Sequence, residues 1–187
     1  MQKDPNPQGK GISPVLQDLA RSRSTIPLPP KHIDQVSGEL FTSLFVLNSE
    51  FNFRPVVGRS YWLYRLEEKF KLLLLGPGDW TAGHPGKFIA ECVLREDVTW
   101  TLTLDESAAR DENLLQFIEE QRKRLQADLE KAVSLEEAIP AYIPSLDFYR
   151  RLLAFGLGGS LRSSLRAAGI HALTWNEAKG LLAKASA

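Results

Sequence analysis

The chain has 187 residues, of which 43% are hydrophobic and 25% charged, which is enough to bury one hydrophobic core. Its formal net charge is zero, which excludes a whole-protein field that would attract nucleic acid or an anionic membrane. The chain has one cysteine, no apolar run of roughly 20 residues and no apolar signal-peptide run at its N-terminus, so we expect a cytoplasmic protein in a reducing compartment.

The charge is unevenly distributed along the chain. Residues 1–32 hold five basic and two acidic side chains, and residues 140–187 hold six basic and two acidic ones. These ends therefore carry +3 and +4, which leaves −7 for residues 33–139. An acidic centre between basic ends can serve self-association or partner docking, and a solvated surface explains it equally.

The first third of the chain contains two predicted helices. Residues 1–11 are polar and rich in Pro, Gly and Lys, which places them outside the core. Ser13 can cap a short helix that runs through Leu16 and Leu19, and the prolines of residues 22–30 predict an extended segment after it. A longer helix is predicted over residues 32–52, because apolar side chains recur every three or four positions. This stripe consists of Ile33, Val36, Leu40, Leu44, Leu47 and Phe51, widened by Phe41 and Phe45.

Two β-hairpins follow. Residues 58–65 and 69–75 are rich in aromatic and branched side chains across a short polar gap, and so are residues 87–95 and 98–104. Residues 76–86 between the hairpins are dense in Gly and Pro, which predicts a turn-rich loop. We therefore expect four antiparallel strands.

The two hairpins differ in how their faces are patterned. In the second, one face is apolar and the other polar, which is typical of a sheet buried on one side only. In the first, Tyr61 and Leu63 face one way, Trp62 and Tyr64 the other, and residues 72–75 are apolar on both faces. A helix, a partner or a second subunit is therefore expected to cover the outer face. The apolar face of the second hairpin consists of Phe88, Ala90, Cys92, Leu94, Val98, Trp100, Leu102 and Leu104.

The remainder of the chain is predicted to be helical. A long helix starts at Asp105 or Ser107 and reaches about Val133, with a narrow apolar stripe that suits packing along a groove or against a twin helix. Capping boxes at Ser134 and Thr174 open a short helical turn and the last helix. Between them we expect a helix capped by Ser145, an interruption at residues 158–159, and a further helix to Ala168. The long helix's stripe consists of Leu114, Ile118, Leu125 and Leu129.

These elements predict an α+β fold. A four-stranded antiparallel sheet packs on helices, and a C-terminal helical cluster follows. We divide the chain into an extended N-terminal segment (residues 1–31), an α+β core (residues 32–134) and the C-terminal helical cluster (residues 135–187).

Candidate ligand-binding residues lie in the loop of residues 76–86 and in the strand before it. Loops held on rigid sheets often carry binding residues, although we expect core packing to be the use of most of the aromatic rings. The three histidines lack partners at metal-ligand spacing, and Cys92 alternates in phase with the core, so we predict neither a metal nor a cofactor nor a catalytic residue. The candidates are Asp79, Trp80, His84, Tyr61 and Tyr64.

The C-terminal helices offer a second candidate surface. Four arginines accompany apolar side chains there, as in helices that lie on anionic membranes or dock on acidic partners. The alternative is that these helices pack on the core, and the acidic middle of the chain offers the arginines a partner in either case. The glycine-rich run of residues 155–166 could hold a phosphate at a helix start, or pack closely between two helices. The arginines are Arg150, Arg151, Arg162 and Arg166.

Part of the chain resembles a known family. The pattern covers roughly residues 50–103 and resembles domain-of-unknown-function family twenty-four fifty-two, which occurs in bacteria and animals. The resemblance implies that the sheet is a unit, and it implies no reaction, cofactor or catalytic residue. The residues that carry it are Tyr61, Leu63, Tyr64, Arg65, Phe70, Pro77, Trp80, Pro85, Phe88, Trp100 and Thr101.

The sequence favours a non-enzymatic protein-interaction module that binds a protein partner or a second copy of itself. This hypothesis rests on the apolar surface on both faces of the first hairpin. The alternative is a small-molecule binder or enzyme that uses the loop of residues 76–86. Basic side chains around the aromatic row are too sparse for a nucleic-acid groove, and contact of the basic helices with a membrane surface is a weaker third hypothesis.

Overall fold

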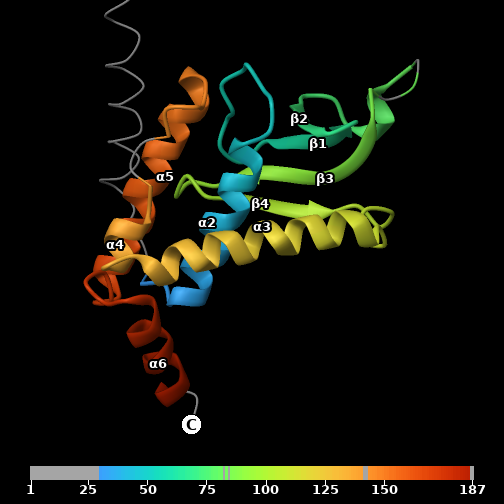
Figure 1. Ribbon diagram of the computed structural model, residues 1–187. Coiled ribbons are helices and arrows are strands. Elements are labelled where there is room, and N and C mark those ends of the chain that lie inside the picture. Colours follow the sequence, from blue (N-terminus) through green and yellow to red (C-terminus); the bar gives the residue numbers. More distant parts are fainter. Residues whose placement is uncertain (1–29, 82, 84, 141–142, 186–187) are drawn as a thin grey trace, which may run out of the picture.

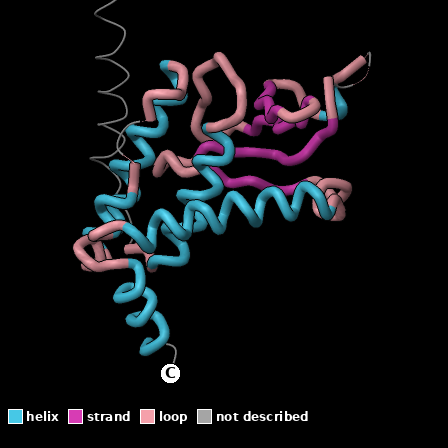
Figure 2. The backbone as a smooth tube through the Cα atoms, in the orientation of Figure 1, coloured by secondary structure: helices cyan, strands magenta, loops and turns pink. Residues whose placement is uncertain are grey.

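The computed structural model describes residues 30–81, 83, 85–140 and 143–185 (Figures 1 and 2). It confirms the α+β class, the four-stranded antiparallel sheet and the C-terminal helical cluster. The short helix predicted after Ser13 lies outside the described residues. In chain order the elements are α2 (Ile33–Leu47), β1 (Ser60–Leu66), β2 (Lys69–Leu73), the 3₁₀ turn η2 (Pro77–Asp79), β3 (Lys87–Leu94), β4 (Trp100–Leu104), α3 (Glu112–Lys131), α4 (Leu135–Ala138), α5 (Phe148–Ala167) and α6 (Trp175–Ala185).

The sheet has the strand order β2-β1-β3-β4, with antiparallel neighbours throughout. Its register is broken once, because Leu63 pairs with Ala90 while Tyr64 pairs with Phe88, so that Ile89 is an extra residue on β3. This bulge corrects the prediction for Phe88. Its ring lies 5.5 Å from that of Tyr64 on the outer face, while Ile89 joins the buried core.

Helix α2 ends at Leu47, five positions before the predicted end at residue 52. The chain leaves the helix because Glu50 pairs with the edge of β2: its N–H donates to the carbonyl of Phe70, and its carbonyl accepts from the N–H of Leu72. Phe51 is buried, as its place in the stripe predicts, but it lies beyond the helix.

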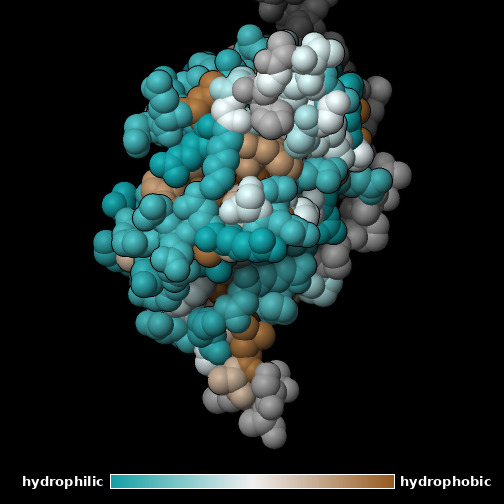
Figure 3. Space-filling model, turned by 90° about the vertical axis from the view of Figure 1, so that its right-hand side faces the viewer, coloured by the Kyte–Doolittle hydropathy of each residue, from teal (hydrophilic) through white to brown (hydrophobic). Residues whose placement is uncertain are grey.

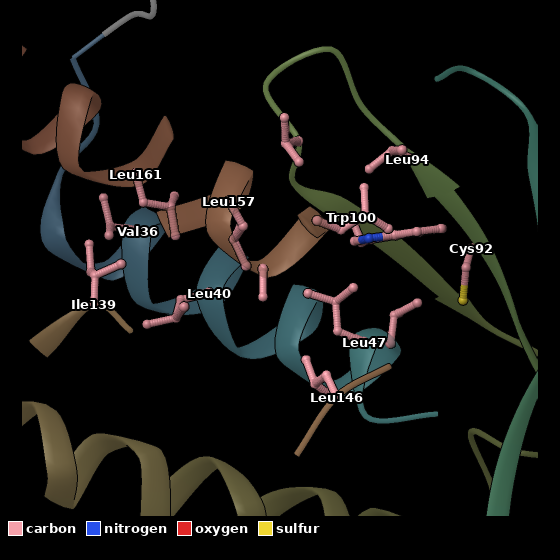
Figure 4. Packing of buried hydrophobic residues seen from close by; sticks show 14 of the residues in the cluster. Val36, Leu40, Leu47, Cys92, Leu94, Trp100, Ile139, Leu146, Leu157 and Leu161 are labelled. Atoms are coloured by element: carbon pink, nitrogen blue, oxygen red, sulfur yellow. The ribbon is translucent and has the colours of Figure 1, made fainter. Parts of the chain in front are cut away.

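The core lies between the inner face of the sheet, α2 and α5, with α2 between the other two (Figure 1). Figure 4 shows Leu40 of α2 near Leu157 and Leu161 of α5, with Trp100 of β4 close by. Cys92 is buried in this core, as predicted, and burial raises its pKa to about 12. A thiol that stays protonated at neutral pH is not a nucleophile.

The start of α3 differs from the prediction. Asp105 accepts hydrogen bonds from Ser107 and closes a local turn, so the helix begins only after Asp111, whose carboxylate accepts from the N–H of Leu114. The Asp111 carboxylate also pairs with Lys87 at 2.6 Å, which ties the helix start to the beginning of β3.

Helix α5 is continuous from Phe148 to Ala167, which corrects the predicted interruption at residues 158–159 and the predicted cap at Ser145. The glycines are there for close packing. A Cβ added at Gly158 would lie 2.5 Å from the carbonyl oxygen of Pro140, and one at Gly156 would lie 3.3 Å from Val98. Residues 155–166 therefore offer no free helix start for a phosphate.

Both predicted capping boxes stand at helix starts, but their hydrogen bonds differ. The Ser134 hydroxyl accepts a hydrogen bond from the N–H of Glu137 at the start of α4. At the start of α6, Thr174 and Glu177 bond to each other reciprocally. Local sequence thus predicts these starts correctly.

Candidate functional site

Residues 76–81, the first part of the predicted loop, fold onto the outer face of the first hairpin. The Asp79 carboxylate accepts from the N–H of Gly76 at 2.8 Å and closes the turn. The Trp80 indole N–H donates to the Tyr64 hydroxyl at 3.1 Å, and that hydroxyl donates to the carbonyl of Leu75 at 3.2 Å. Burial raises the pKa of Tyr64. These bonds give Asp79 and Trp80 a structural use, while His84 lies outside the described residues.

The structure does not bring the two candidate tyrosines together. Tyr61 belongs to the inner core, where its hydroxyl accepts from the N–H of Val56 at 2.7 Å. Tyr64 lies on the opposite face under Trp80. The chain's own Trp80 thus covers Tyr64 on the outer face of the first hairpin, and the exposed apolar residues of this hairpin are Leu74 and Leu75, just after β2.

The candidate arginines Arg150, Arg162 and Arg166 bond to neighbouring parts of their own chain. Arg150 donates to the carbonyl of Ser49 at 2.9 Å and pairs with Asp147. Arg162 donates to the carbonyls of Glu136 and Ile139 at the end of α4. Arg166 pairs with the carboxylate of Glu136 and thereby lowers its pKa.

An open groove of about 580 Å³ lies between α2, β2 and α3. Four phenylalanine rings lie along it in an unbroken series, with centroid separations of 6.1 Å from Phe41 to Phe45, 5.1 Å from Phe45 to Phe70 and 5.9 Å from Phe70 to Phe117. Aromatic rings bury much apolar area with little conformational freedom to lose, so this series forms a preorganised apolar floor.

The rim of the groove is polar. On the side of β2, Glu50 pairs with Lys69 at 2.9 Å, and this hydrogen bond lowers the pKa of Glu50. On the side of α3, Gln121, Arg124 and Asp128 line the wall. Arg124 forms no ion pair with any residue that the structure describes. The groove therefore offers a hydrophobic floor and a cation at its edge.

The groove exists because α3 is buried only near its two ends. The buried residues of α3 are Leu114 and Leu129, about 22 Å apart along the helix axis. Between them the helix bridges over Phe45 and Phe70, which are only partly buried. Where Arg122 lies 5.2 Å above the ring of Phe41, a smaller hollow of about 280 Å³ continues toward α6.

Sequence reasoning missed this groove. Phe41 and Phe45 were assigned to the helix stripe and Phe70 to a strand, and Phe117 falls outside the predicted stripe of α3. The one available signal was an exposed phenylalanine on an otherwise polar helix face.

Figure 3, which looks at the side with the loop of residues 76–86 and the start of α3, shows a mostly hydrophilic surface with small apolar patches.

Comparisons with family models, curated proteins and solved structures gave no match. The resemblance of residues 50–103 to the uncharacterised family therefore stays a prediction. Within the described residues, no helix has the length and apolar character to cross a membrane, and no group of three His, Cys, Asp or Glu side chains is placed to hold a metal ion.

Proposed function

We propose that the protein is a non-enzymatic interaction module that binds a short amphipathic segment of a partner protein in the groove between α2, β2 and α3. The observation that carries this proposal is the series of four phenylalanine rings, three from α2 and β2 and one from α3, that lines the open groove. The side chains that line the groove include no histidine or cysteine, and its one serine, Ser49, is buried and donates to the carbonyl of Val46.

The chemistry of the groove defines the partner. An amphipathic helix places apolar anchors at i, i+4 and i+7 along one face, and such anchors can pack against neighbouring rings of the series. The lining also carries the carboxylates of Glu68 and Asp128, so an acidic side chain of the occupant finds its complementary charge only beside Arg124. The occupant is thus an amphipathic helix with apolar anchors and a flanking carboxylate.

A small-molecule ligand is the second candidate function. A volume of about 580 Å³ lies within the usual range for ligand sites, which is roughly 300–1,000 Å³. We therefore propose the groove, and not the loop of residues 76–86, as the site of a small-molecule ligand. The loop remains an untested prediction, and the bonds of Asp79 and Trp80 to their own chain do not favour it.

Selection from a displayed library of random peptides tests the proposal. Peptides enriched on the full chain should share the anchor spacing and a flanking acidic residue. Phe117→Glu should weaken their binding by at least about tenfold, because it removes one ring and places a charge on the apolar floor. Leu115→Glu is the matched control, since both side chains are 39% exposed on α3 and only Phe117 lines the groove.

The outcomes separate the candidates. Equal effects of the two substitutions, or enriched peptides without a common spacing, would refute the groove as a peptide site. Light scattering on the same proteins tests self-association, and a dimer dissociated by Phe117→Glu would identify the occupant as a second copy. The predicted cytoplasmic location needs its own test, for which a tagged full chain and cell fractionation suffice.

A further inference from the structure

A second apolar surface lies on α5 and is unrelated to the groove. Most of α5 is buried, but Phe148, Leu152 and Phe155 follow one another at i, i+4 and i+7 along its exposed side. Phe155 is 52% exposed, and Tyr149 packs edge-on against Phe148 with ring centroids 5.4 Å apart. Gly159 continues this side by one turn, which leaves room for a second helix to approach closely.

The N-terminal segment meets the folded body beside this surface. The ammonium group of Lys31 pairs with Glu39 at 2.5 Å and with Asp97 at 2.7 Å, which fixes the position where residues 1–29 join the described structure. Asp97 precedes Val98, and a Cβ at Gly156 of α5 would lie 3.3 Å from Val98. The Lys31 side chain therefore reaches the β3–β4 turn, and the same turn packs through Val98 on Gly156 in the middle of α5.

We propose that residues 12–19 of this chain dock on the apolar side of α5 formed by Phe148, Leu152 and Phe155. The segment reads ISPVLQDL, and helical spacing aligns its four apolar side chains at i, i+3, i+4 and i+7. Such a stripe complements the stripe on α5 as one helix packs on another. The apolar residues of the segment are Ile12, Val15, Leu16 and Leu19.

The linking segment has the required length. Residues 20–29 can span roughly 33 Å when extended, and their prolines favour an extended conformation. The apolar side of α5 from Phe148 to Phe155 is about 10 Å long. The linker is thus about three times as long as the surface, which allows residues 12–19 to reach this side of α5 from Lys31. The effective concentration of a tethered segment favours this contact over an equivalent contact with a second chain.

Thiol accessibility on the full chain tests the proposal. Because Cys92 is buried and protonated, a cysteine introduced by Phe155→Cys is the only reactive thiol. We expect this thiol to react about tenfold more slowly than one introduced by Leu181→Cys. If residues 12–19 stay docked for about 90% of the time, the reagent reaches position 155 only in the remaining tenth. The two positions are matched, with side chains 52% and 51% exposed in the described structure.

A second variant places charges on the apolar stripe of residues 12–19. Adding Leu16→Asp and Leu19→Asp should restore fast reaction at position 155 and leave position 181 unchanged. If position 155 already reacts as fast as position 181, and the aspartates change neither rate, the proposal is wrong. The substitutions at positions 155 and 181 are on exposed side chains, and those at positions 16 and 19 are in the N-terminal segment. Circular dichroism is the control for folding of each variant.

Cross-linking identifies the occupant. Leu16→Cys combined with Phe155→Cys should form a disulfide within one chain, whereas Leu16→Cys with Leu181→Cys should not. A disulfide-linked dimer in place of the internal bond would assign this face to a second copy and overturn the proposal. The result is independent of peptide binding in the groove, because no residue of the α5 surface lines that groove.

Discussion

Replacing Lys31 by methionine should cost more stability than the loss of any surface ion pair in this protein. The ammonium group lies between two carboxylates at 2.5 and 2.7 Å, and the Lys31 side chain is only 4% exposed. Methionine keeps the apolar stem but leaves Glu39 and Asp97 facing each other, 14% and 13% exposed, without their cation. Removing one partner of a buried ion pair typically costs 3–5 kcal/mol, and we expect about 3 kcal/mol because Asp97 keeps its hydrogen bonds from Thr99.

Urea unfolding followed by circular dichroism at pH 7 measures this loss. Lys69→Met is the control, because its ion pair with Glu50 is solvent-exposed on both sides and should contribute no more than about 1 kcal/mol. A loss below about 1 kcal/mol for Lys31→Met, or one equal to that of the control, would refute the argument that this buried cluster holds the chain before α2 against the β3–β4 turn.

The same variant should show a distinct pH dependence. Burial acts to raise the pKa of Asp97, but hydrogen bonds from Lys31 and Thr99 and the charge of Lys31 outweigh it and hold the pKa below its ordinary value of 3.8. A carboxyl with a lowered folded pKa stabilises the protein above about pH 4, and this stabilisation is lost as the pH falls through the folded pKa. The difference between Lys31→Met and the parent chain should therefore shrink below about pH 4.

Two further predictions concern the core. Gly158→Ala should destabilise the fold by about 1–3 kcal/mol, because the new methyl group meets the Pro140 carbonyl. Gly180→Ala in α6 should instead raise the midpoint of thermal unfolding, because the added carbon meets nothing within 4 Å and alanine favours the helix. Equal effects of the two alanines would contradict the packing at α5. Cys92 should react with a thiol reagent only as fast as the protein unfolds in increasing urea, since the folded state buries the thiol with a pKa of about 12. Rapid reaction without urea would show that β3 opens locally.

The sequence predicted those features that local chemistry decides. Runs of aromatic and branched side chains located all four strands, and the side chains of Ser134 and Thr174 marked two helix starts. Where long-range pairing competes with local preference, the predictions failed. The stripe of α2 continues in sequence to Phe51, but the bridge of Glu50 to β2 ends the helix earlier.

The candidate site could not be predicted for a related reason. A groove depends on where a helix packs incompletely on its neighbours, and no periodicity within α3 reveals that only Leu114 and Leu129 are fully buried. Gly158 and Gly159 are predicted to interrupt the helix, because the sequence does not show that the Pro140 carbonyl packs against Gly158. Trp80 of the loop is a predicted ligand-binding residue. The bulge at Ile89, which brings Phe88 next to Tyr64, is not marked by any local sequence pattern.

The pairing of Glu50 with β2 also determines how this protein can engage other chains. Two of the outward-facing backbone groups of the edge strand, the carbonyl of Phe70 and the N–H of Leu72, are already occupied by a residue of the same chain. A foreign strand that extended the sheet at this side would first have to displace Glu50, which discourages β-augmentation and amyloid-like stacking. Recognition at this edge must therefore rely on side chains and on the shape they enclose, and it cannot rely on backbone ladders.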